Sequence, residues 1–228
     1  MSAALGTGRL ELRGVGLQAG GRVLIEPLDL AVIPGQLATV MGPSGCGKSS
    51  LLAYICGTLD PGLQAGGQVV LNGVDVTALP PERRRIGILF QDDLLFPHLS
   101  VAENLAFGLP PSLRDRAARR TRIDAALADA DLTGFGDRDP ATLSGGQRAR
   151  VALLRTLLAE PRALLLDEPF ATLDVGLRTR FRRFVFEHVR SNRLPTILVT
   201  HDPADAPACG GPMIQIGLTG EANGIDGI

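Results

Sequence analysis

The first third of the chain alternates apolar and polar residues, and compact apolar runs follow, separated by longer helical patterns. Period-two alternation around Leu10, Val23 and Leu28 predicts half-buried antiparallel strands. Later apolar runs of four or five residues each end at a polar or glycine-rich turn, which is typical of buried parallel strands. The runs predicted as such strands are Leu37–Met41, Ile86–Phe90, Ala163–Leu166 and Thr196–Thr200, and Gly67–Leu71 is predicted to enter a hairpin turn at Asn72-Gly73.

Helical patterns fill much of the remaining chain. Ser100 and Glu103 have the spacing of a capping box, which marks a helix start. The predicted helices are Lys48–Gly57, a short one after Ser100, Ser112–Leu132, Arg148–Ala159 and Asp174–Asn192. The block from Gln91 to Pro140 has no apolar strand run, which indicates helices inserted between strands. We therefore predict an α/β protein with a mostly parallel core sheet, an antiparallel β subdomain and an inserted helical subdomain.

Composition narrows the possible classes of protein. The 228 residues are 45% hydrophobic and 21% charged, which excludes a disordered chain. Three cysteines without metal-binding spacing favour a reducing compartment. No apolar run is long enough to predict a membrane span. The net charge of −1 gives no basic footprint, so no nucleic-acid partner is expected. Among 23 basic residues only one is a lysine, Lys48.

A glycine-rich loop joins the strand at Leu37–Met41 to a helix. It has the G-x-x-x-x-G-K-[ST] pattern in which backbone N–H groups and a helix N-terminus surround phosphates. Lys48 would supply a compact charge to the β and γ phosphates, and the Ser49 hydroxyl would bind Mg²⁺. The alternative is a glycine turn with a chance lysine. The residues expected to bind nucleotide here are Gly42, Pro43, Ser44, Gly45, Cys46, Gly47, Lys48, Ser49 and Ser50.

Two carboxylates, Asp167 and Glu168, follow the apolar strand at Ala163–Leu166. Ligands of open α/β sheets lie beyond the carboxyl ends of the strands. Asp167 is therefore expected to hold Mg²⁺, and Glu168 to orient or deprotonate an attacking water. The alternative is that the two acids only cap a turn.

A second glycine-rich sequence, Leu143–Gln147, precedes another helix. Ser144 and Gln147 have capping-box spacing, so this could be a well-capped structural helix. Two adjacent glycines destabilise a helix start, however, unless a backbone or ligand must approach closely. A hydroxyl, bare amides and a helix N-terminus would form a second phosphate cradle. A symmetric dimer in which each copy completes the other's site would use both cradles.

Taken together, these motifs resemble those of the ATP-binding subunits of ABC transporters, in family order across essentially the whole chain. The matching elements are the Walker A loop Gly42–Ser49, the Q-loop Gln91, the signature Leu143–Gln147, the Walker B acids Asp167 and Glu168, the D-loop Ala171–Asp174 and the switch histidine His201. Residues 86–92 and 140–155 look most like YnjD-type bacterial importers. Thiamine, sulfate and iron(III) importer ATPases resemble the chain less closely.

The resemblance implies a P-loop NTPase with the ABC-cassette fold as a single domain over residues 1–228. The RecA-like core with its antiparallel part would comprise about residues 1–90 and 141–217, the helical subdomain about 91–140, and a flexible tail 218–228. ATP and Mg²⁺ are the implied cofactors. Lys48, Gln91, Glu168 and His201 would act in hydrolysis, with Gln91 also contacting Mg²⁺ or its water. Ser144, Gly145, Gly146, Gln147 and Asp174 are the further residues expected to bind nucleotide.

The same resemblance implies partners. ATP would drive homodimerisation, and a separate integral-membrane permease would hold the subunit at the cytoplasmic face of the inner membrane. A periplasmic solute-binding protein would complete an import system. The helical lobe between Gln91 and Pro140, including Phe96–Leu99, is the expected docking surface. The alternatives left open are a soluble, non-transport ABC ATPase and a P-loop small-molecule kinase.

One position departs from the family. The aromatic residue that normally stacks on adenine would lie about 23 positions before Gly42, where this chain has Ala19. Because such stacking is worth roughly 1–3 kcal/mol, we expect weaker or less base-selective binding. Arg13 or Arg22 could replace the aromatic ring with a flat cation.

Overall fold

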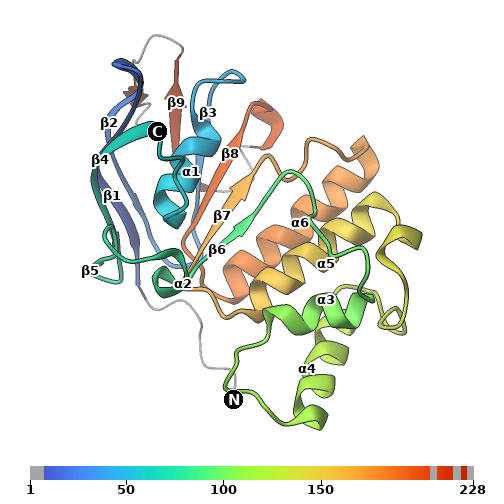
Figure 1. Ribbon diagram of the computed structural model, residues 1–228. Helices are drawn as coiled ribbons and strands as arrows, with labels where there is room; N and C mark the ends of the chain where they lie inside the picture. Colours follow the sequence, from blue (N-terminus) through green and yellow to red (C-terminus); the bar gives the residue numbers. More distant parts are fainter. Residues whose placement is uncertain (1–7, 206–209, 218–221, 225–228) are drawn as a thin grey trace. The chain divides into compact units, whose positions relative to one another are not determined.

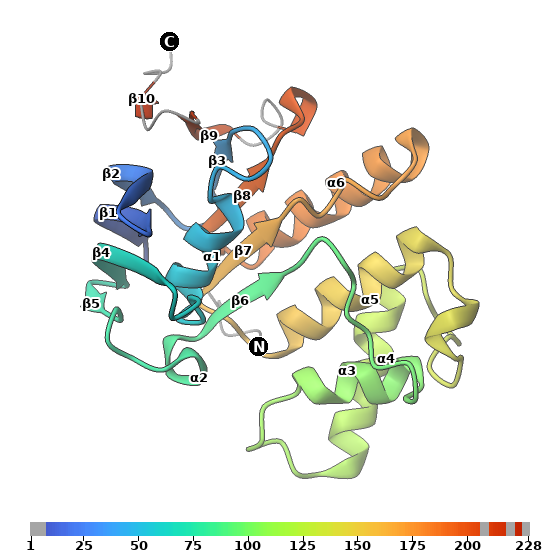
Figure 2. The ribbon, with the colours of Figure 1, turned by 45° about the horizontal axis from the view of Figure 1, so that its top comes forward.

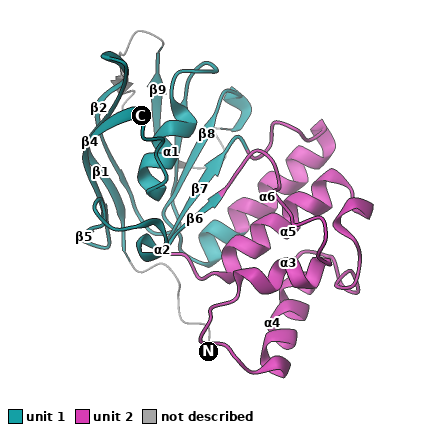
Figure 3. Ribbon diagram, in the orientation of Figure 1, with its two compact units in different colours: residues 1–88, 162–168, 188–228 teal, residues 89–161, 169–187 magenta. Residues whose placement is uncertain are grey.

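The computed structural model describes residues 8–205, 210–217 and 222–224. The chain divides into two compact units (Figure 3). The first contains residues 1–88, 162–168 and 188–228, and the second contains residues 89–161 and 169–187. The second unit is larger than the helical subdomain predicted over about 91–140, because two later helices cluster with that segment rather than with the sheets.

An antiparallel sheet in the order β2-β1-β4-β5 forms one part of the first unit. Its strands are β1 (Leu10–Ala19), β2 (Arg22–Val32), β4 (Leu63–Leu71) and β5 (Val74–Asp75). In the β1–β2 register, Leu10 pairs with Val32 and Leu12 pairs with Leu30, all of them buried. The period-two alternation thus predicted these strands correctly, and Asn72-Gly73 makes the expected turn between β4 and β5.

A second sheet has the order β10-β9-β3-β8-β7-β6. Strands β7, β8, β3 and β9 run parallel, and β10 pairs antiparallel with β9. The bounds are β3 (Leu37–Met41), β6 (Ile86–Leu89), β7 (Ala163–Asp167), β8 (Thr196–Thr200), β9 (Gly210–Ile216) and β10 (Ala222–Gly224). Since β3, β7 and β8 are buried along nearly their whole length, the continuous apolar runs identified them.

Helix α1 (Lys48–Cys56) lies between the two sheets of the first unit (Figures 1 and 2). Its Leu51, Leu52 and Ile55 are fully buried in a core shared with β1, β2, β3, β7 and β8. This packing fixes the position of the loop that precedes α1. The short helix α2 (Pro81–Arg84) and the 3₁₀ turn η2 (Pro203–Asp205) complete the unit.

The second unit is helical over most of its length. It contains α3 (Val101–Gly108), α4 (Arg116–Asp129), the 3₁₀ turn η1 (Pro140–Thr142), α5 (Gly145–Leu158) and most of α6 (Val175–Ser191). Ser100 and Glu103 form the predicted capping box. Helix α4 starts four residues later than predicted because Asp115 caps it, and α5 starts three residues earlier because Ser144 caps it.

The C-terminal part of the chain differs from the sequence prediction. Strand β9 was not predicted, because Pro212 and the paired glycines at 210 and 211 obscure its apolar pattern. Residues 218–221 and 225–228 of the expected tail lie outside the described residues, whereas Ala222–Gly224 form β10. Within the described part of the chain, every helix is too short or too polar to cross a lipid bilayer.

Candidate functional site

The glycine-rich loop lies between β3 and α1, as its motif requires. A Cβ atom at Gly42 would lie 2.5 Å from the Ile216 carbonyl oxygen, so only glycine fits beside β9. Gly47 has φ 96° and is the N-cap of α1, where it leaves the first N–H groups without a side-chain partner. The loop therefore presents the free amides and the positive helix end that bind phosphate.

Lys48 is folded back onto this loop. Its ammonium donates hydrogen bonds to the carbonyl oxygens of Gly42, at 2.8 Å, and Pro43, at 2.9 Å. The side chain is only 5% exposed. Lys48 therefore already points along the loop that would enclose the phosphates.

The carboxylates that follow β7 lie beside this loop. The Ser49 hydroxyl donates to Asp167 Oδ1 at 3.1 Å, which joins two residues 118 positions apart. Burial raises the pKa of the Asp167 carboxyl above its ordinary value, the Ser49 hydrogen bond and the Lys48 charge act to lower it, and the Glu168 carboxylate acts to raise it. A hydroxyl and a carboxylate in contact are hard oxygen donors of the kind that Mg²⁺ prefers.

Glu168 connects the loop to the switch histidine. Lys48 Nζ lies 3.4 Å from Glu168 Oε1, and His201 Nδ1 lies 2.7 Å from Glu168 Oε2. Glu168 has φ 44°, a left-handed conformation that a residue other than glycine rarely adopts, and its N–H donates to the Val199 carbonyl at 3.0 Å. Strained backbone of this kind often occurs where a side chain must point at a site. No sequence pattern predicted this conformation.

Within the first unit, the sequence-predicted side chains thus form two contact groups: Ser49 with Asp167, and Glu168 with both Lys48 and His201. Gln91, the signature residues 144–147 and Asp174 belong to the second unit. There, Gln91 and Gly145 line one cavity, together with Asp93 and Arg148. Asp174 accepts a hydrogen bond from the Leu177 N–H and so caps α6, a contact that the sequence analysis missed.

The signature sequence forms the first turn of α5. The Ser144 hydroxyl accepts from the Gln147 N–H at 3.3 Å, and the Ser144 N–H donates to Gln147 Oε1 at 2.9 Å, which makes the predicted capping box. A Cβ atom at Gly145 would meet only Leu173 at an ordinary 3.7 Å. The local packing therefore does not require glycine there, although glycine destabilises a helix by roughly 0.5–1 kcal/mol relative to alanine. An approaching ligand explains this glycine better than the fold does.

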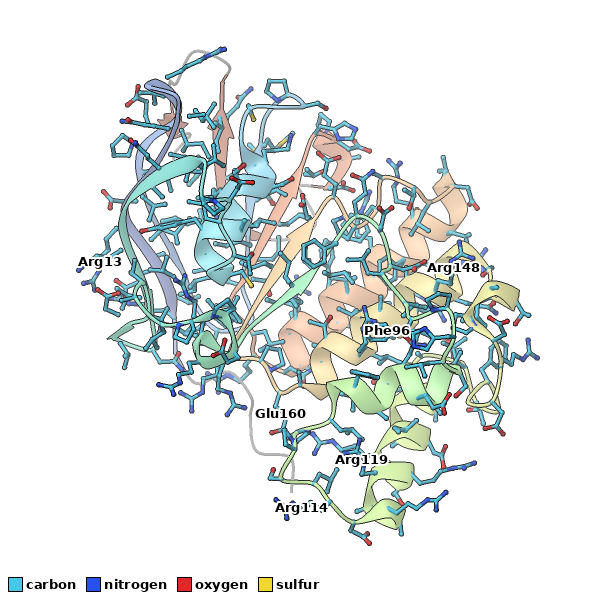
Figure 4. The ribbon with its side chains drawn as sticks, in the orientation of Figure 1. Arg13, Phe96, Arg114, Arg119, Arg148 and Glu160 are labelled. Atoms are coloured by element: carbon cyan, nitrogen blue, oxygen red, sulfur yellow. The ribbon has the colours of Figure 1, made fainter. Side chains whose placement is uncertain are left out.

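Ala19 stands where an adenine-stacking aromatic residue was expected. Ala19 ends β1 and pairs with Arg22 across the Gly20-Gly21 turn. Arg13 lies farther back on β1, where its guanidinium donates to the Glu11 carboxylate at 2.9 Å (Figure 4). Of the two arginines predicted to replace the ring, Arg13 is thus engaged elsewhere, and Arg22 is the one beside Ala19.

A phosphate loop after β3, a carboxylate pair at the end of β7, which β8 separates from β3 in the same parallel sheet, and a histidine that contacts the second acid define a P-loop nucleotide hydrolase. The family model described as ABC transporter matches residues 25–171. The chain belongs to this family and is one of its ATP-hydrolysing, ATP-binding subunits.

Individual relatives show how far the similarity extends. The chain is 49% identical over 197 residues to the ABC transporter ATP-binding protein YnjD of Escherichia coli K12, covering 86% of this chain and 90% of that one. It is 41% identical to the Fe(3+) ions import ATP-binding protein FbpC 3 of Rhodococcus jostii RHA1, over 86% of this chain and 56% of that protein. The chain thus spans about half the length of that import ATPase.

A solved structure agrees with the fold. The dimeric, post-hydrolysis ATP-binding cassette MJ0796, bound to ADP and Pi, is 27% identical and superimposes with a TM-score of 0.79. The match covers 96% of this chain and 100% of that one. The expected ABC-cassette fold and the expected importer-like resemblance are both confirmed.

Proposed function

We propose that the protein energises a multi-component importer by binding MgATP at Lys48 and hydrolysing it with Glu168. The observation that most supports this proposal is that Glu168 contacts both the phosphate-loop lysine, Lys48, and His201. The names of two similar proteins, which describe import of Fe(3+) ions and of sulfate/thiosulfate, support an import role. The identity of the transported solute would depend on other subunits.

Each residue of the first unit has a chemical role in this proposal. Lys48 exchanges its loop carbonyls for the β and γ phosphate oxygens, and the backbone N–H groups of residues 44–50 surround the phosphates. Glu168 accepts a proton from the water that attacks the γ phosphorus in line. His201 holds Glu168 in place and donates a hydrogen bond to the γ phosphate. Catalysis is then mainly positioning and charge neutralisation.

Mg²⁺ fits the donor set of the site. Ser49 Oγ and Asp167 Oδ1 lie 3.1 Å apart, and Gln91 would supply a third oxygen, directly or through water. Among the described residues, no group of three or more His, Cys, Asp or Glu side chains could hold a metal alone. Two protein oxygens plus phosphates and water are the usual arrangement for Mg²⁺. When bound, the ion would neutralise charge on the β and γ phosphates.

The signature residues Ser144–Gln147 and Asp174 would complete the site of a second copy. In that homodimer the α5 N-terminus of one copy would grip the γ phosphate held by Lys48 of the other. The local packing at Gly145, which does not require glycine, and the dimeric state of the similar cassette MJ0796 support this arrangement. ATP would hold the two copies together, and hydrolysis would release them.

The permease would dock on exposed aromatic residues of the second unit. Phe107 is 66% exposed, and its ring centre lies 4.6 Å from that of Phe96. Leu94 is also largely exposed nearby in sequence. Exposed apolar groups of this kind mark protein-binding surfaces. Through the permease the subunit would lie at the cytoplasmic face of the inner membrane, with a periplasmic solute-binding protein delivering the solute.

Replacing the proposed base tests the hydrolytic mechanism. Glu168→Gln removes the proton acceptor but keeps the side-chain size, so phosphate release should fall by about 10²–10⁴-fold while ATP binding persists. Glu82→Gln, an exposed glutamate of the same unit, is the matched control and should retain full activity. Undiminished turnover in Glu168→Gln would show that another group activates water. Phosphate release without any acceptor molecule would also exclude a small-molecule kinase.

A further inference from the structure

Two arginines of α5, Arg148 and Arg155, contact the segment that follows Gln91. Arg155 follows Arg148 by seven positions, which is about two helical turns, so both side chains lie on the same face of α5. Both reach residues 93–96, which are more than fifty positions earlier in the chain. Neither side chain belongs to the nucleotide-binding residues described above.

Arg148 makes two contacts in different directions. Its Nε donates to Asp93 Oδ2 at 2.8 Å, and its Nη1 donates to the Leu143 carbonyl oxygen at 2.8 Å. Leu143 directly precedes Ser144, the cap of α5. One rigid guanidinium therefore joins the segment after Gln91 to the start of the signature sequence. Arg148 and Phe96 are labelled in Figure 4.

Arg155 holds the same segment by its backbone. It donates to the carbonyl oxygens of Leu94, at 2.9 Å, and Asp93, at 3.1 Å, and its guanidinium lies 5.5 Å from the centre of the Phe96 ring. Asn104 also donates to the Phe96 carbonyl and accepts from the Phe96 N–H. These contacts attach residues 93–96 to α5 through Arg155 and to α3 through Asn104.

Gln91 and Gly145 lie beside the Arg148–Asp93 pair. Both line the cavity that Asp93 and Arg148 also line, so a shift of Gln91 or of Gly145 would change the surroundings of the Arg148 side chain. The ion pair itself is modest, since the side chains of Arg148 and Asp93 are 38% and 30% exposed. Partly exposed pairs contribute about 0–1 kcal/mol to folding stability. Stability alone therefore gives little reason for this geometry.

We propose that Arg148 is a positioning residue that couples residues 91–96 to the signature sequence, with Asp93 as its anchor. A shift of the exposed segment around Phe96 would pull Arg148 through Asp93 and re-aim the Leu143–Ser144 turn. The grip of the signature on ATP held by a second copy would then change. The inference rests on the proposed function, because it assigns a task to the docking segment and to the dimer.

ATP-driven dimerisation in the Glu168→Gln background tests this coupling. Asp93→Asn should weaken dimerisation by about tenfold, a coupling of the size found for contacting residues. Binding of a fluorescent ATP analogue to the monomer and the thermal unfolding midpoint should stay unchanged. The matched control is Asp124→Asn, which removes the exposed Arg120–Asp124 pair on α4 and should leave dimerisation unaffected.

A double-mutant cycle separates coupling from independent effects. Arg148→Gln alone should weaken dimerisation about as much as Asp93→Asn, and the double variant should be no weaker than either single one. Arg148→Lys should restore little, because an ammonium cannot hold Asp93 and Leu143 in the same planar geometry. Additive effects of Asp93→Asn and Arg148→Gln, or an effect no larger than that of Asp124→Asn, would overturn the inference. Failure of Glu168→Gln itself to dimerise would instead count against the proposed function.

Discussion

At the scale of single residues, Lys48 is the position where the chain departs from its general use of arginine. The ammonium fits between two loop carbonyls and still lies 3.4 Å from Glu168. A planar guanidinium is larger and presents its donors in a rigid fork. The geometry therefore accounts for a lysine in a chain whose other basic residues, 22 of 23, are arginine.

Motif residues could be named from the sequence because each motif is local. The contacts that join the motifs could not, because Ser49 and Asp167, and Glu168 and His201, come from distant positions and meet only through the sheet register. The left-handed φ of Glu168 could not be predicted either, because the sequence Asp-Glu-Pro does not require that backbone conformation. The residues of the candidate site were therefore predictable from the sequence, whereas the contacts between them were not.

Base recognition is the residue-scale property that Ala19 should control. Because Ala19 offers no ring, the ratio of ATP to GTP in kcat/KM should stay below about a hundredfold. Ala19→Tyr should strengthen ATP binding by roughly 1–3 kcal/mol, since base–aromatic stacking is worth that much. Equilibrium binding of ATP to the two proteins measures the gain.

The matched control for this substitution is Ala19→Leu, which adds apolar volume without a ring face. It should gain much less affinity than Ala19→Tyr. Equal affinities for all three proteins would mean that adenine does not approach the end of β1.

At the scale of elements, the two ends of α1 differ in their chemistry. Its N-terminus is open toward the loop, whereas its C-terminal carbonyls accept from a buried cation. Arg84 Nη1 donates to the carbonyls of Tyr54, at 2.7 Å, and Ile55, at 2.9 Å, and Nε donates to that of Leu79 at 2.8 Å. Burial lowers the pKa of Arg84, which is the last residue of the four-residue helix α2.

Removing Arg84 should therefore destabilise the protein. Arg84→Met keeps the apolar stem but leaves buried carbonyls without donors, at about 1–3 kcal/mol for each unsatisfied group. We expect a loss of at least about 3 kcal/mol in the free energy of unfolding, measured by urea denaturation. Arg83→Met, the exposed neighbour, should change it by less than about 0.5 kcal/mol. A loss no greater than that of Arg83→Met would mean that water satisfies these carbonyls.

The strands and helices with strong periodicity were predicted well, and their ends less well. Strands β3, β7 and β8 are continuous apolar runs, so the sequence predicts that they are buried. Strand β9 was missed because Pro212 interrupts it, and it forms because parallel pairing with β3 outweighs that propensity. Tertiary contact with β3, not local preference, thus places β9 in the second sheet.

At the scale of the whole molecule, the phosphate loop and the signature sequence belong to different compact units. Each carries a helix N-terminus of the kind that can bind an anion, at α1 and at α5. A protein that binds one nucleotide per copy has a use for both only if a second copy supplies the other half. The central claim is therefore that ATP joins two copies and that hydrolysis separates them.

The most direct test is the solution mass of the Glu168→Gln variant, measured by light scattering with and without ATP. The mass should rise from that of one 24.0 kDa chain to about twice that value when ATP and Mg²⁺ saturate the site, and ADP should not cause the rise. Adding Gly145→Asp to the same variant should prevent the rise without preventing ATP binding, because the carboxylate would repel the γ phosphate. A mass that stays at one chain while ATP is measurably bound would contradict the account.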